Sequence, residues 1–172
     1  RFAKDIPQRK RVSVADILPR FSGSLSAPPM IFHSAVCCST LMAKALDAEG
    51  ICLSLKEPNI LMALANAKRM LRRAGRVDAQ FADLYHAVTQ LLSRRFIPSE
   101  IVLLKLPNTA NNLLEEAKIA GSPRLIMYAS LEDFLISVLK KGEYCKTLIR
   151  THYNIFSLDP CKLAERAGRH AI

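Results

Sequence analysis

The sequence predicts a three-layer α/β/α domain with a mainly parallel central sheet. Short apolar runs suited to buried strands alternate with longer segments of helical periodicity, which is the pattern of parallel strands joined by crossover helices. The chain has 172 residues, of which 50% are hydrophobic, so it can bury one substantial core. The runs predicted as strands are residues 30–33, 51–55, 101–105 and 124–128.

Helices are predicted between these strands from the spacing of apolar residues and from residues that favour helix ends. Gly50 ends the first helix and Pro58 suits the start of the next. Ser130 and Gly142 are placed to begin and end a later one. The predicted helices are residues 39–47, a segment with apolar positions from 60 to 71, residues 81–92, 110–120 and 130–141, and one or two more within 144–170.

Two regions are expected along the chain. Residues 1–29 are basic and are interrupted by four prolines and a Ser-Gly-Ser stretch, which predicts an irregular N-terminal arm. Residues 30–172 are expected to form a single α/β domain. The chain begins without Met and ends abruptly on Arg-His-Ala-Ile, which fits a cut from a longer protein at either end.

The charge balance favours anionic ligands or partners. Lys and Arg outnumber Asp and Glu by 25 to 15, which gives a formal charge of +10. One basic run has spacings of three and four that place it on one face of a helix, either as a solvated face or as a binding surface. Nucleic-acid binding is disfavoured because the basic runs lack interleaved aromatic residues. The run consists of Lys68, Arg69, Arg72, Arg73 and Arg76.

The five cysteines indicate free thiols rather than disulfides or a metal site. They are odd in number, form no CxxC pair and have no histidine cluster at metal-ligand spacing, so no bound metal is expected. Free thiols suggest a reducing compartment. The sequence shows no signal peptide and no apolar run of membrane-spanning length, and we therefore expect a cytoplasmic protein without a membrane span.

The segment after the first predicted strand is the strongest candidate for a binding site. An apolar strand runs into a turn of small residues and then directly into a helix, which exposes backbone N–H groups to an anion. The turn lacks the glycines and the lysine of a nucleotide-triphosphate loop, and no acidic residue ends the third strand to hold magnesium, which disfavours an ordinary ATPase or GTPase. The alternative is a plain structural turn capped by Ser39. The candidate residues are Ser34, Ala35, Val36, Cys37, Cys38, Ser39 and Thr40.

This turn resembles the 5′-phosphosulfate-binding loop of P-loop sulfotransferases, which often reads Ser-Arg-Cys/Ser-Gly-Ser/Thr-Thr. The chain keeps the two hydroxyls at Ser39 and Thr40 and has Cys38 in place of the glycine. The sequence Lys-Glu-Pro at 56–58 is similar to the Arg/Lys-Glu-Pro that follows the second strand in bacterial members. The resemblance implies a P-loop-like fold and covers roughly residues 30–142.

A second similarity lies in the fourth strand and the helix after it. The family's 3′-phosphate motif carries an arginine, a proline, an aspartate and a serine. Here Asp133 and Ser137 match, whereas Ala129 replaces the arginine and Leu131 the proline. Independently, Ser130 and Ser137 lie seven residues apart and so face the same side of a helix. Ser130 could instead be only a helix cap, and Ser137 only a packed small residue.

Three further residues are candidates for chemistry at the same edge of the sheet. Lys105 resembles the lysine of a Lys-x-x-Leu-Pro sequence and would neutralise the leaving oxygen, although the family's histidine after it is missing. Glu57 is the candidate general base, or else only complements a helix dipole. His33 either contacts the anion or, as we favour, completes the strand. A thiol nucleophile at Cys37 or Cys38 is disfavoured because the neighbouring sequence contains no Asp or His, other than His33, that could activate the thiol.

The resemblance implies a sulfotransferase. It would move a sulfuryl group from the co-substrate 3′-phosphoadenosine 5′-phosphosulfate to a hydroxyl or amine of a small-molecule or glycan acceptor, without a metal ion. The alternative is a non-catalytic, degenerate P-loop module that binds nucleotide and acts through its basic faces on an anionic partner.

Overall fold

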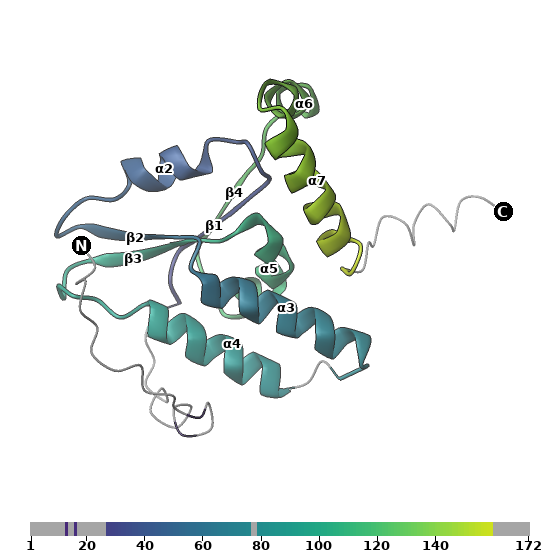
Figure 1. Ribbon diagram of the computed structural model, residues 1–172. Coiled ribbons are helices and arrows are strands. Elements are labelled where there is room, and N and C mark those ends of the chain that lie inside the picture. The colour runs from purple at the N-terminus through teal and green to yellow at the C-terminus, as the bar shows by residue number, and fades with distance from the viewer. Residues whose placement is uncertain (1–12, 14–15, 17–26, 77–78, 160–172) are drawn as a thin grey trace.

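The computed structural model describes residues 13, 16, 27–76 and 79–159. Its centre is a four-stranded, all-parallel sheet with strand order β2-β3-β1-β4 (Figure 1). The predicted fold class is confirmed, and β4 lies beside β1 at one edge of the sheet. The arm predicted over 1–29 falls almost entirely outside the described residues. The strands are β1 (Met30–His33), β2 (Cys52–Lys56), β3 (Ile101–Lys105) and β4 (Arg124–Met127).

Helices flank both faces of the sheet. α2 covers one face, and α3, α4 and α5 lie on the other, while α6 and α7 follow β4 (Figure 1). These layers match the predicted three-layer arrangement. The helices are α2 (Ser39–Ala45), α3 (Asn59–Arg73), α4 (Ala79–Leu92), the 3₁₀ helix η2 (Asn108–Leu113), α5 (Leu114–Ile119), α6 (Leu131–Lys140) and α7 (Glu143–Phe156).

The alternation of side chains along the strands divides the core into a large and a small part. Met30 and Phe32 of β1 point to the side of α3 and α4, where they are buried with Leu104 of β3. Ile31 and Leu103 point to the other side and pack against Ala43 of α2. This is the period of two expected of a strand that is covered on both faces. The short helix α2 therefore lies on a thin layer of apolar side chains.

One predicted helix begins differently from the expectation. The segment predicted as a helix over 110–120 starts two residues earlier, as the 3₁₀ helix η2, and becomes α-helical only at Leu114. Two side chains of η2 hold it in place: Asn111 donates to the His33 carbonyl at 2.9 Å and Asn112 donates to the Ala65 carbonyl at 3.1 Å. Bonds from Asn side chains to distant backbone are tertiary contacts, which helical periodicity does not reveal.

β4 is an exposed edge strand, although its apolar sequence predicted a buried one. It pairs with β1 on one side, and residues 124–126 are exposed, with Ile126 57% accessible. Strand propensity and hydrophobicity predicted the strand itself correctly. Its burial depends on what lies on either side, which a single run of residues does not encode.

Two of the five basic residues of the run, Lys68 and Arg69, are internal, whereas Arg73 and Arg76 are exposed. Lys68 is fully buried and donates to the Asn112 carbonyl at 2.6 Å and to the Glu116 carboxylate at 2.5 Å. Arg69 is 2% exposed and makes a two-pronged contact with Asp159, at 3.0 and 2.7 Å, and a bond to the Thr109 carbonyl. The expectation of a free basic face is therefore wrong for these two residues, because acidic side chains from distant segments neutralise them.

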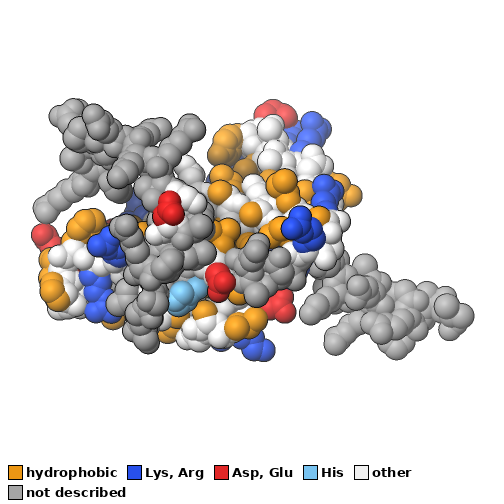
Figure 2. All heavy atoms as spheres, turned by 90° about the horizontal axis from the view of Figure 1, so that it is seen from below, with side chains coloured by type: hydrophobic (Ala, Val, Ile, Leu, Met, Phe, Trp, Pro, Cys, Tyr) orange, Lys and Arg blue, Asp and Glu red, His pale blue; other side chains and the backbone are white. Residues whose placement is uncertain are grey.

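Charges of both signs are interspersed on the side of α3 and α4. Among the described side chains of this face, Figure 2 shows Lys and Arg scattered between acidic and hydrophobic groups. Arg72 also pairs with Glu115 at 3.2 Å. Within the ranges 27–76 and 79–159, no helix is both long and apolar enough to cross a membrane.

Removal of the Lys68 charge should destabilise the domain strongly. We expect Lys68→Met to lower the free energy of unfolding by about 3–5 kcal/mol, because Glu116 then keeps a poorly solvated charge without its partner. Urea denaturation followed by circular dichroism measures the change.

Two variants serve as controls for this experiment. Arg73→Met, on the exposed side of the same helix, should change the stability by no more than about 0.5 kcal/mol. The double variant Lys68→Met/Glu116→Leu removes both charges and should recover most of the loss. A Lys68→Met effect as small as that of Arg73→Met would contradict the buried ion pair.

Candidate functional site

The carboxyl ends of β1, β2 and β3 meet at one edge of the sheet, where they border a groove of about 770 Å³. The opposite wall of the groove comes from α6 and α7. Most of the predicted site residues line this groove together. They are Ala35, Val36, Cys37, Cys38, Ser39, Thr40, Glu57, Lys105 and Ser137.

Three residues that line the groove have the left-handed backbone conformation, which is strained for any residue except glycine. Val36, Cys38 and Glu57 have φ angles of 63°, 59° and 54°, and they are all the non-glycine residues with positive φ in the described part of the chain. The left-handed region costs an L-residue roughly 1–2 kcal/mol, and for a β-branched residue it is rare. Such strain persists where the surrounding structure imposes it, and it concentrates at functional sites.

The turn after β1 is held from both sides. The His33 ring lies between the Ser34 and Leu106 carbonyls, with its Nδ1 and Nε2 each 2.8 Å from one of them. Because carbonyl oxygens only accept, the imidazolium form makes both bonds and the neutral form makes one. On the other side, the Cys37 thiol donates to the Ser34 carbonyl at 3.0 Å and the Ser34 N–H donates to the Met127 carbonyl at 3.0 Å.

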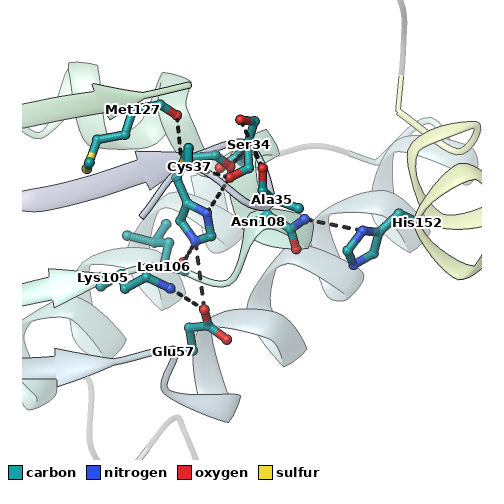
Figure 3. A network of polar contacts seen from close by, with 11 residues as sticks. Ser34, Ala35, Cys37, Glu57, Lys105, Leu106, Asn108, Met127 and His152 are labelled. Atoms are coloured by element: carbon teal, nitrogen blue, oxygen red, sulfur yellow. Dashed lines mark hydrogen bonds and ion pairs between the residues drawn. The ribbon is translucent and has the colours of Figure 1, made fainter. Parts of the chain in front are cut away.

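Glu57 and Lys105 form an ion pair at the end of the sheet. The Lys105 ammonium donates to Glu57 Oε1, and the Glu57 N–H donates to the Lys105 carbonyl at 2.8 Å (Figure 3). The Lys105 side chain is buried, with 1% exposed, whereas 49% of the Glu57 side chain is exposed. His33 Nε2 lies 3.8 Å from the same carboxylate oxygen. The carboxylate of Glu57 is therefore accessible, and it lies between the Lys105 ammonium and the His33 ring.

The two serines predicted on α6 have different roles. Ser137 lines the groove together with residues 35–40 of the turn. Ser130 does not: its hydroxyl accepts from the Asp133 N–H at 3.0 Å and donates to the Asp133 carboxylate at 2.7 Å. Ser130 is thus the N-cap of α6, which was the alternative interpretation. Ser34 borders a smaller cavity next to the groove.

Several lining residues were not found from the sequence. Lys141 follows Ser137 by four positions, so helical spacing alone could have suggested it. His152 comes from α7, for which no motif was recognised. Asn108 lies 3.3 Å from His152 Nδ1, and burial lowers the pKa of this histidine below its ordinary value. The place of His152 in the groove could not be predicted from the sequence, because it depends on how α7 packs against η2.

The described lining of the groove offers hydroxyl and ammonium groups to an anion rather than ligands for a metal ion. In the described part of the chain, no three His, Cys, Asp or Glu side chains are grouped so that they could hold a metal ion. The cysteines at 37, 38, 52 and 145 are free thiols, and Cys161 lies outside the described residues.

Comparisons of the chain with protein-family models, with curated proteins and with solved structures found no match. The assignment of a function therefore depends on the residues of the groove and on their geometry.

Relief of the left-handed strain should stabilise the domain. Cys38 is the N-cap of α2 with φ 59° and ψ 16°, a conformation that glycine adopts without penalty. We expect Cys38→Gly to raise the free energy of unfolding by about 0.5–1 kcal/mol, after the greater freedom of glycine in the unfolded chain is subtracted. Urea denaturation measures the difference.

Cys38→Ala is the matched control, because it removes the same thiol but keeps an L-residue in the left-handed region. It should show no such gain. Equal stabilities of the Gly and Ala variants would mean that the turn stores no strain at this position.

Proposed function

We propose that the protein is a sulfotransferase that moves a sulfuryl group from 3′-phosphoadenosine 5′-phosphosulfate to a hydroxyl or amine acceptor. The observation that carries the proposal is the composition of the groove. A strand-to-helix turn without a lysine shares the groove with the ion pair of Lys105 and Glu57, which neighbouring strand ends supply. One groove thus combines the start of a helix, a cation and an accessible carboxylate, and we propose that the turn binds the anion.

The charge of the groove supports an anionic donor. Its lining contains Lys105 and Lys141 against the single carboxylate of Glu57. Ser39 and Thr40, at the start of α2, would bind the sulfate or 5′-phosphate oxygens together with backbone N–H groups of the turn. Ser137 and Lys141 would bind the 3′-phosphate, with Lys141 supplying the charge that the family takes from an arginine.

The proposed reaction is an in-line displacement. Glu57 takes the proton of the acceptor hydroxyl, and the acceptor oxygen forms a bond to sulfur while the bond from sulfur to the bridging phosphate oxygen breaks. The products are the sulfate ester and adenosine 3′,5′-bisphosphate. Lys105 and the N–H groups of the turn stabilise the negative charge that develops on the leaving phosphate.

The alternative of a non-catalytic module that acts through basic faces draws less support. Lys68, Arg69 and Arg72 are paired with acidic side chains, so this part of α3 does not offer free charge to an anionic partner.

Binding of the reaction product provides the first test. Adenosine 3′,5′-bisphosphate at about 100 times its Kd should stabilise the domain by about 2.7 kcal/mol and raise the Tm by about 5–10 °C. Thermal unfolding with the bisphosphate is compared with unfolding in ATP and magnesium. Stabilisation by ATP and magnesium in preference to the bisphosphate would overturn the proposal.

A pair of adjacent lysines tests the 3′-phosphate site. Lys141→Met should weaken bisphosphate binding about tenfold, the effect of one lost charge-assisted hydrogen bond. Lys140→Met removes the same charge one position earlier, on an exposed side chain that does not line the groove, and should leave the affinity within about twofold. Calorimetric titration measures both, and equal losses would show a general charge effect instead of a contact.

Replacement of the proposed base should separate chemistry from binding. Glu57→Gln keeps an oxygen that accepts from Lys105 but no longer takes a proton, so we expect the rate to fall by about 100-fold or more. The assay follows conversion of the phosphosulfate to the bisphosphate with a panel of phenols, alcohols and amines. Bisphosphate binding should be retained, and an unchanged rate would exclude Glu57 as the base.

A further inference from the structure

A second cavity of about 370 Å³ adjoins the groove, and its walls are mostly aromatic and aliphatic. The two spaces share the lining residues His33, Ala35, Asn108 and His152, so they lie side by side at this point. The remaining wall is formed mainly by side chains of α6 and α7. These are Phe134, Ile149, Tyr153 and Phe156.

We infer that this cavity holds the acceptor of the proposed sulfuryl transfer, and that the acceptor is a small alcohol, phenol or amine with an apolar, preferably aromatic, body. The inference rests on the proposed function for the reaction itself. It goes beyond that function in selecting one class of acceptor and in excluding glycans.

The chemistry of the walls selects the class. The His152 and Phe156 rings lie with their centroids 5.7 Å apart, and Phe134 adds another aromatic side chain. Burial lowers the pKa of His152, which favours its neutral ring, and the described lining of the cavity contains no Lys, Arg, Asp or Glu. An aromatic ring gains contact area and edge or face interactions here. Beside the two histidines and the Tyr153 hydroxyl, the described lining offers only Ser34, Asn108 and Asn111 as polar side chains. A sugar would bury more hydroxyls than these groups can bond, and each hydroxyl left without a hydrogen bond costs free energy.

The position of the cavity directs the reacting group toward the ion pair. His33 lines both spaces, and its Nε2 lies 3.8 Å from Glu57 Oε1. A hydroxyl that projects from the cavity past His33 therefore enters the groove beside the proposed base. Asn108 stands at the same junction and contacts His152 (Figure 3). The polar groups are thus gathered where the reacting group would pass, and the apolar groups where its body would lie.

The volume restricts the size of the acceptor. A cavity of this size is at the small end of the range for ligand pockets, roughly 300–1,000 Å³, and accommodates one or two fused rings. A phenol or a naphthol fits this limit. An oligosaccharide would exceed it.

The test uses 2-naphthol as the apolar probe and N-acetylglucosamine as the sugar probe. Binding of each is measured by calorimetric titration and by ligand-observed NMR, on the protein alone and on the protein with adenosine 3′,5′-bisphosphate. We expect 2-naphthol to bind and the sugar to show no binding at the same concentrations. Tighter binding of the sugar, or no binding of 2-naphthol, would overturn the inference.

Variants on α7 show whether the probe occupies this cavity. Ile149→Trp fills the cavity and should weaken 2-naphthol binding by about tenfold or more, while the Kd for the bisphosphate stays within about twofold. Thr147→Trp adds the same bulk at an exposed position that lines neither space and should change neither affinity. Phe156→Ala removes an aromatic wall and provides a second test should the tryptophan at 149 unfold the chain. Unchanged 2-naphthol binding in both cavity variants would place the probe elsewhere and refute the assignment.

The two proposals can fail separately. If 2-naphthol binds and is lost in the cavity variants but the bisphosphate does not bind, the cavity is a site for apolar ligands and the sulfotransferase proposal is wrong. If the bisphosphate binds and 2-naphthol does not, the donor site stands and the acceptor class is wrong.

Discussion

The parallel pairing of β1, β2 and β3 is the constraint on which the groove depends. β3 lies between the other two, and Lys105 is in register with both Ile31 and Lys56. Because all three strands run in the same direction, the turn after β1, Glu57 after β2 and Lys105 at the end of β3 arrive at one edge. A shift of one residue in β3 would turn Lys105 to the opposite face of the sheet and separate it from Glu57. The ion pair is therefore a consequence of strand register.

A buried ion pair between Arg69 and Asp159 holds the wall of the groove that lies opposite the strand ends. Arg69 of α3 bonds the Thr109 carbonyl in η2 and the carboxylate of Asp159, which follows α7. Through this one guanidinium, the basic helix is tied to the segments that carry Asn108 and His152. The positive charges of Lys68 and Arg69 thus serve the internal structure, and Lys105 and Lys141 are the lysines of the groove. The left-handed conformations in the turn are held by hydrogen bonds of His33 and Cys37 to backbone carbonyls. These bonds form without a ligand.

His33 links the two halves of the site. It was expected mainly to complete β1, and it does so, yet its ring also joins the turn to β3 and lies near the carboxylate of Glu57. The groove on one side has cationic and hydroxyl groups, whereas the cavity on the other has aromatic walls. An anionic donor and an apolar acceptor would then meet at this histidine, each in surroundings of matching polarity.

The sequence by itself determined the four strands, the fold class and the groove residues at the strand ends, because strands, helix ends and small-residue turns are signalled by neighbours in the chain. Ser130 was placed correctly as a helix start, but its hydroxyl caps α6 and so is not available to a ligand. Only the tertiary structure decided that Lys68 and Arg69 are buried, that β4 is exposed, and that His152 joins the site. Each of these outcomes depends on partners more than 40 positions away or on the absence of a covering element, and local periodicity carries no information about either.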